Sequence, residues 1–257
     1  MNTVSLQPAY ILHHRQFRNT SLIVDLLTPE HGRVSAVARG ARTAKSRRRP
    51  LLQPFRPLLV SWTGRSELRT LTSVEESGMP LSLEGISLSC AYYASELALH
   101  LAPRDTASDI AFAHYVQALV QLVEAADIEV TLRQYELDLL DSLGLLPDLS
   151  CCDRQGAAVD ASANYAFNVK LGQAIRLTAN ADENQSDSIT PGAENPPAVP
   201  GLKISGQALL AMHHRDFADA QVRREAKLLM RQLIAEQLGG QPLKSRALFE
   251  TRPTPGQ

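Results

Sequence analysis

Short runs of apolar and β-branched residues dominate the first 75 positions of the chain, and several of them alternate with polar residues. This period of two predicts five β-strands, at Ala9–His14, Ser21–Thr28, Arg33–Arg39, Leu58–Trp62 and Glu67–Ser73. Five strands in about 65 residues, joined by one long loop, are typical of a small closed or partly open barrel.

The third of these strands alternates most clearly. Val34, Ala36 and Ala38 would share one face, which suits a barrel core, while Arg33 and Arg39 would lie on the other. The strand therefore has an apolar face and a partly basic face, and Gly40 ends it.

The period changes after Met79-Pro80, and helical spacing of apolar residues begins at Leu83. The stripes predict helices over 83–102, 112–123, 132–143, 205–214 and 219–238, and we interpret their apolar residues as core. The predicted fold class is α+β, with a five-stranded OB-fold barrel over residues 1–79 and a mainly α-helical domain over 80–250.

Two segments of the second domain depart from the helical pattern. Residues 150–178 are irregular, with a short hairpin expected from Tyr165–Val169 and Ala174–Thr178. Residues 178–200 are polar, acidic and proline-rich, so we expect a flexible insert with no assigned role.

Charge is distributed unevenly along the 257 residues, although the formal net charge is only -1. Residues 1–80 carry twelve Lys and Arg side chains against five carboxylates, a balance of +7, and the remainder carries -8. Such asymmetry indicates a basic binding module joined to an acidic or neutral one.

Much of the positive charge lies between Gly32 and Pro57, and no Asp or Glu occurs between Glu30 and Glu67. Phosphate backbones are the usual partners of a patch that repels itself this strongly. The candidate phosphate contacts are Arg33, Arg39, Arg42, Lys45, Arg47, Arg48, Arg49 and Arg56. A solvated basic loop, or a barrel that docks proteins, would show the same charges.

No constellation of catalytic residues is evident, so we do not expect an enzyme or a cofactor. The sequence lacks a Gly-rich phosphate loop, and the paired histidines at 13–14 and 213–214 point apart in a strand or a helix. Cys90, Cys151 and Cys152 include no Cys-x-x-Cys knuckle, so no structural zinc is expected either. A reactive thiol at Cys151 or Cys152 would be the enzymatic alternative.

No apolar run reaches the length of a membrane span, and the N-terminus does not look like a signal peptide. Three cysteines without a plausible disulfide framework suit a reducing compartment. The sequence therefore predicts a cytoplasmic protein.

The order of these features resembles the RecO family of bacterial recombination mediators. The residues that carry the resemblance are Tyr10-Ile11-Leu12, Thr20-Ser21-Leu22, Gly32-Arg33-Val34, Ala38-Arg39-Gly40-Ala41-Arg42, Leu52-Gln53-Pro54-Phe55, Leu132-Arg133-Gln134-Tyr135-Glu136, Leu143-Gly144 and the run from Leu238 to Arg246. They span nearly the whole chain.

The resemblance implies an OB barrel followed by a helical domain. It implies binding to single- and double-stranded DNA at the nucleoid, annealing of complementary strands, and help in loading RecA. The implied partners are RecR and the acidic tail of single-strand-binding protein, for which Arg133 matches the family's basic position. Lys227 and Arg231 would complete the rim of that site. Many relatives have a four-cysteine zinc motif near Cys151, which this sequence lacks.

Two further interpretations of the sequence stay open. A basic RNA-binding or translation-associated barrel would account for the same charges. Arg133 could also be an ordinary arginine that pairs with Glu136 or Glu129.

Overall fold

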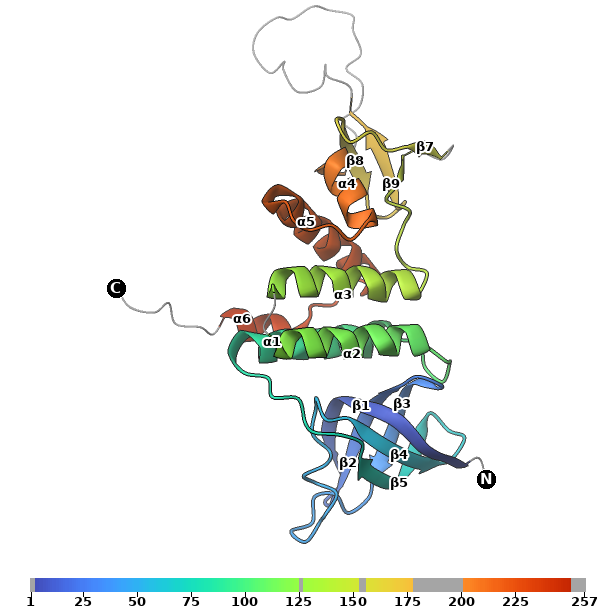
Figure 1. Ribbon diagram of the computed structural model, residues 1–257. Coiled ribbons are helices and arrows are strands. Elements are labelled where there is room, and N and C mark those ends of the chain that lie inside the picture. The colour runs from blue at the N-terminus through green and yellow to red at the C-terminus, as the bar shows by residue number, and fades with distance from the viewer. Residues whose placement is uncertain (1–2, 125–126, 153–155, 178–200, 251–257) are drawn as a thin grey trace, which may run out of the picture. The chain divides into compact units, whose positions relative to one another are not determined.

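The structure is a computed structural model that describes residues 3–124, 127–152, 156–177 and 201–250 (Figure 1). The insert predicted at 178–200 lies outside the described residues. The chain forms two compact units, one from residues 1–143 and 241–257 and the other from residues 144–240. The boundary predicted after residue 79 falls within the first unit, between its barrel and its helices, and stays a prediction.

The first unit begins with the expected barrel. Its strands are β1 (Thr3–Phe17), β2 (Ser21–Thr28), β3 (Gly32–Ala38), β4 (Leu58–Thr63) and β5 (Leu68–Glu76). They close in the order β1-β2-β3-β5-β4, with β3 and β5 parallel and the other pairs antiparallel. The five-stranded barrel predicted from the sequence is confirmed.

Strand β1 closes the barrel because it is long enough to pair with two neighbours. Its second half pairs with β2 and its first half with β4, and the register shifts once in each ladder. Such irregularities bend a strand and increase its twist, which allows one strand to belong to both sides of a barrel.

The barrel interior is filled by the faces that the alternation predicted. Val34, Ala36 and Ala38 of β3 are at most 1% exposed and pack with Leu22, Val24 and Leu26 of β2. Trp62 and Leu71 add bulk from β4 and β5.

Three helices follow the barrel in the same unit: α1 (Gly85–Leu101), α2 (Asp109–Val123) and α3 (Ile128–Ser142). Aromatic rings join α2 and α3 to the barrel. The ring centroids of Tyr10 in β1 and Tyr115 in α2 are 5.7 Å apart, and those of Tyr115 and Tyr135 in α3 are 6.4 Å apart. The unit ends with a 3-10 turn at Lys244–Arg246 and the short helix α6 (Ala247–Glu250).

The second unit contains a small mixed sheet and two helices. The sheet has the order β10-β8-β9-β6-β7, and the helices are α4 (Gly206–His213) and α5 (Ala220–Gln237). Its strands are β6 (Cys151–Cys152), β7 (Ala157–Ala158), β8 (Asn164–Asn168), β9 (Gln173–Arg176) and β10 (Leu202–Ser205). The expected hairpin is β8 and β9, whereas β6, β7 and β10 are too short to show a period in the sequence.

Candidate nucleic-acid interface

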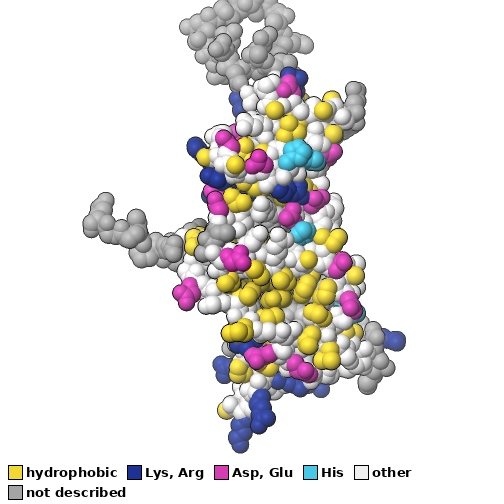
Figure 2. Space-filling view, in the orientation of Figure 1, with side chains coloured by type: hydrophobic (Ala, Val, Ile, Leu, Met, Phe, Trp, Pro, Cys, Tyr) yellow, Lys and Arg dark blue, Asp and Glu magenta, His cyan; other side chains and the backbone are white. Residues whose placement is uncertain are grey.

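The basic loop runs from Arg39 to Pro57, between β3 and β4. In Figure 1 most of the loop lies at the far end of the barrel, where Figure 2 shows Lys and Arg side chains gathered. Near the end of the loop, Phe55 packs on Tyr92 of α1, with ring centroids 5.0 Å apart. Ala41 and Leu52 are fully buried in the barrel core, so the loop is packed at both of its ends.

Two arginines of the loop hold it in place. Arg42 donates to two carbonyl oxygens of the β1–β2 turn, at 3.2 and 3.3 Å. Arg48 donates to the carbonyl oxygen of Thr72 in β5 at 2.7 Å. Hydrogen bonds from a charged donor are stronger than neutral ones, so these two contacts fix the loop against the barrel.

Two further candidate arginines contact residues of the barrel strands or lie on their outer face. Arg56 forms an ion pair with Glu76 of β5. Arg33 is half-buried on the outer face of β3, where its side chain lines a groove.

The remaining four candidates, Arg39, Lys45, Arg47 and Arg49, are exposed. In the described part of the chain, none of these four side chains forms an ion pair or a hydrogen bond. Their charges are therefore available to an anion from solvent. The structure thus divides the predicted set into residues that position the loop and residues that are open to a ligand.

Arg15 and Arg18 were missed in the sequence analysis. Both are exposed on the first hairpin, and the loop packs against this hairpin through Arg42. The signal was present in the sequence, since both arginines lie between the first two predicted strands, three residues apart. They extend the basic surface beyond the loop.

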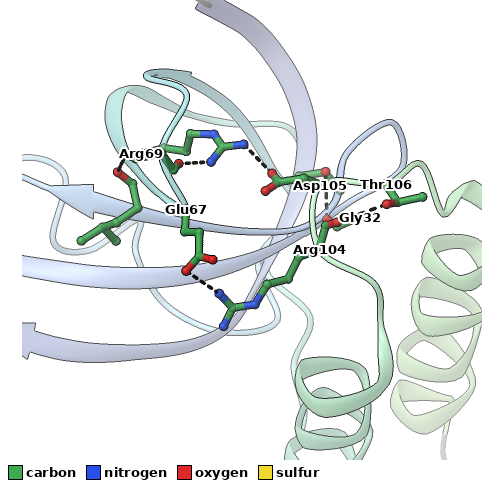
Figure 3. Close-up of polar contacts among 9 residues, drawn as sticks. Gly32, Glu67, Arg69, Arg104, Asp105 and Thr106 are labelled. Carbon is green, nitrogen blue, oxygen red and sulfur yellow. Dashed lines mark hydrogen bonds and ion pairs between the residues drawn. The ribbon is translucent and has the colours of Figure 1, made fainter.

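A groove of about 360 Å³ lies on the outer face of the barrel, beside the C-terminal end of α1. Arg15, Arg33 and Arg104 line it together with His100, Asp25 and Glu67. Figure 3 shows how Arg69 donates to Asp105 at 2.6 Å and so holds the α1–α2 loop, which carries Arg104, against the barrel. Burial, together with the nearby charge of Arg104, lowers the pKa of Arg33.

Arg133, the residue assigned to partner binding, lies in a buried ion pair on α3. Its guanidinium is 2.6 and 2.7 Å from the two carboxylate oxygens of Glu136, and Tyr93 donates to one of them at 2.6 Å. Burial raises the pKa of Glu136, and the charge of Arg133 and the hydrogen bond from Tyr93 oppose this change. The pairing with Glu136 is the alternative that the sequence left open.

Lys227 and Arg231 are exposed on α5, which belongs to the second unit, whereas Arg133 belongs to the first. The structure therefore does not bring the three predicted residues together within one unit. Their common role in partner binding stays a prediction.

The thiols and histidines were the other chemical candidates. Burial raises the pKa of the Cys90 thiol to about 11, which makes it a poor nucleophile at neutral pH. Cys152 is buried in β6 and Cys151 is half-buried. Among the residues that the structure describes, no three His, Cys, Asp or Glu side chains are grouped so that they could hold a metal ion.

Over the described ranges, no helix is both long enough and apolar enough to cross a bilayer.

Comparison with known families shows to which family the chain belongs. The family model described as "Recombination protein O N terminal" matches residues 1–78, which include all five barrel strands. The model described as "Recombination protein O C terminal" matches residues 83–247. The chain belongs to the RecO family. The resemblance found in the sequence is confirmed over nearly its whole length.

Curated RecO proteins are similar to this chain from end to end. Proteins named "DNA repair protein RecO" from Coxiella burnetii and Alteromonas mediterranea are 40% and 39% identical to it over 246 residues. The alignments cover 96% and 95% of this chain, and 98% and 97% of those relatives. The RecO of Haemophilus influenzae is 37% identical over 95% of both chains.

Proposed function

We propose that this RecO-family chain acts in DNA repair and recombination by binding DNA at the basic end of its barrel. The observation that carries the proposal is the group of four exposed cations, Arg39, Lys45, Arg47 and Arg49, that form no ion pair or hydrogen bond within the described residues. Arg15 and Arg18 enlarge the same surface. The names of the curated relatives support the role in DNA repair.

The mechanism requires no covalent chemistry. Two complementary strands repel each other through their phosphates, and a basic surface that neutralises both lowers this barrier while the bases stay free to pair. Arginine suits the task because its planar fork makes bidentate contacts to phosphate. We propose annealing of complementary strands on this surface, with contacts to the backbone rather than to base edges and therefore weak sequence preference.

The family also suggests partners, which we propose for this chain. They are RecR and the acidic tail of single-strand-binding protein, through which the chain would help to load RecA on covered DNA at the nucleoid. For the tail we keep Arg133, Lys227 and Arg231 as the proposed contacts. Arg133 is only 8% exposed, so it would act from a largely buried position rather than from an open surface.

The proposal is tested by salt-dependent binding of single-stranded DNA to a variant with Lys45, Arg47 and Arg49 changed to Ala. We leave Arg48 in place because it anchors the loop. If the three side chains contact phosphates, affinity falls and the slope of log K against log salt flattens by about two units, or roughly 0.7 for each lost contact.

A matched control changes Arg65, Lys170 and Arg224 to Ala, three exposed cations away from the loop. It removes the same net charge, so an equal loss of affinity in both variants would show only a general effect of charge. An unchanged slope in the loop variant would refute the proposed surface. A strong preference for RNA over DNA in competition would favour an RNA-binding protein instead.

A further inference from the structure

The groove beside α1 differs from the basic loop because it is a concave site. Its floor is the outer face of the barrel, with Arg15 of β1, Ile23 of β2 and Ser35 of β3. Leu99 and His100, at the end of α1, form a wall, and Arg104, in the following loop, lies beside Arg33. All of these residues belong to the first compact unit.

Positive charge in the groove is incompletely balanced. The Nε atom of Arg33 is buried and has no hydrogen-bond partner in the described part of the chain. Buried polar groups are nearly always hydrogen-bonded, so the protein leaves the Arg33 guanidinium incompletely satisfied. Arg104 lies beside Arg33, because the α1–α2 loop pairs with the start of β3, and two neighbouring guanidinium groups can together bind an oxyanion.

The two carboxylates of the groove balance the positive charge only in part, although the charge of Asp25 does act on Arg33. Asp25 accepts a hydrogen bond from Ser35 at 2.5 Å and lies 3.6 Å from His13. The side chain of Glu67 is 89% exposed, and its nearest contact with Arg104 is 3.9 Å. Exposed ion pairs of this kind contribute little, so an incoming phosphate can displace Glu67.

The groove also has an apolar side, formed by Ile23, Leu68 and Leu99. A ligand that combines a phosphate with a flat apolar group matches this lining. The volume of the groove, about 360 Å³, suits one nucleotide rather than a folded peptide. The outer face of β3 leads from Arg33 to Arg39 at the basic loop, a distance of roughly 20 Å at about 3.3 Å per residue. A polyanion with regularly spaced charges could follow this face.

We infer that the groove binds one nucleotide of a single DNA strand, with its phosphate between Arg33 and Arg104 and its base against Leu68 and Leu99. The inference rests on the proposed function, because it extends the path of the bound strand from the basic loop along β3 into the groove. OB barrels bind oligonucleotides on such strand faces, and here the end of α1 forms the outer boundary of the site.

The test measures the affinity of the full-length protein for oligo-dT by fluorescence anisotropy across a salt series. Arg104→Ala removes one side of the phosphate site, so we expect about tenfold weaker binding at low salt and a slope lower by about 0.7. Glu67→Gln removes the competing carboxylate and is expected to strengthen binding. Arg65→Ala is the matched control, because this exposed arginine lies in the β4–β5 turn and does not line the groove.

Arg104→Ala and Glu67→Gln have opposite expected effects on DNA affinity, which distinguishes a loss of contacts from a loss of structure. A loss of structure would weaken binding in both, whereas the inference requires Arg104→Ala to weaken it and Glu67→Gln to strengthen it. Circular dichroism checks that each variant is folded.

Failure of this inference can be distinguished from failure of the proposed function. If the loop variant weakens binding but Arg104→Ala matches Arg65→Ala, DNA binds the loop and the groove inference is wrong. If neither set weakens binding, the proposed function fails as well. If Arg104→Ala impairs binding of an acidic peptide while oligo-dT affinity is unchanged, the groove is a peptide site and the inference is overturned.

Discussion

At the scale of single residues, Gly32 allows the barrel to approach the α1–α2 loop. It begins β3 with a φ of +56°, and a Cβ atom there would lie 2.4 Å from the carbonyl oxygen of Thr106 and 2.6 Å from that of Pro103. Arg33 donates its backbone N–H to the same Pro103 oxygen at 2.9 Å. The contact drawn in Figure 3 therefore depends on a residue without a side chain.

We predict that Gly32→Ala lowers the free energy of unfolding by about 3 kcal/mol, since it combines a left-handed backbone with two backbone clashes. Gly40→Ala is the control, because Gly40 has a φ of +68° but nothing within 4 Å of an added Cβ. The control should cost only about 1 kcal/mol. Equal losses in urea unfolding of the two variants would contradict the role given to the close contact.

At the scale of one element, α3 carries Arg133 and Glu136, which form a buried group with Tyr93 of α1. Glu136 is 1% exposed and accepts from both partners, so a buried polar network joins α3 to α1. Removing one member of such a network strongly destabilises the fold, because the remaining buried charge then has no partner. This explains how a polar sequence at positions 133–136 can belong to a core helix.

We predict that Glu136→Gln destabilises the protein by about 3 kcal/mol. Replacing all three residues by apolar ones (Arg133→Met, Glu136→Leu, Tyr93→Phe) should recover most of that loss, as measured by thermal and urea unfolding. A triple variant that is no more stable than Glu136→Gln would contradict this account.

The same triple variant separates two roles of Arg133. If the arginine serves folding alone, the stable triple variant binds the tail peptide of single-strand-binding protein as the wild type does. If it contacts the peptide, calorimetry shows lost affinity in a protein of normal stability.

At the scale of the whole molecule, the first unit is discontinuous in sequence. Residues 241–250 return to α1 after the chain has formed the second unit, and Leu243 and Ser245 are buried there. Glu96 of α1 accepts from the backbone N–H groups of Lys244 and Ser245, both at 2.8 Å. Burial alone would raise the pKa of Glu96, but these hydrogen bonds and nearby His100 lower it overall.

We predict that Glu96→Ala costs about 2 kcal/mol of unfolding free energy, because two charge-assisted hydrogen bonds are lost. Because the pKa is lowered in the folded state, this contribution is complete above the unfolded pKa, about 4.3, and is lost as the pH falls through the folded value. The variant should therefore lose less stability than the wild type on acidification from pH 7 to pH 3.

Glu84→Ala is the control on the same helix, since Glu84 is exposed and makes no capping hydrogen bond with its side chain. Its stability should stay within about 0.5 kcal/mol of the wild type. A loss as large as that of Glu96→Ala would show that the return of the chain is not what Glu96 stabilises.

The sequence by itself determined the barrel strands, the main helices and the concentration of charge in the loop. Alternation in β3 and helical spacing in α3 are local patterns, and burial of one face follows from them directly. The excess of arginine between Gly32 and Pro57 is likewise visible without a fold.

Only the tertiary structure decided what each cation does. Arg42 and Arg48 anchor the loop, Arg133 is buried against Glu136, and Arg33 lies beside Arg104 at a groove. The strands β6 and β10 also emerged only through pairing with β9 and β8, whereas β7 pairs locally with β6. The physical reason is that a hydrogen bond or a strand pairing is defined by its partner, and the partner of Arg48 lies 24 residues away, where local periodicity carries no information about it. Arg133 and Glu136 are only three residues apart, and there the sequence leaves open whether the pair is exposed or buried, which the packing of α3 against Tyr93 of α1 decides.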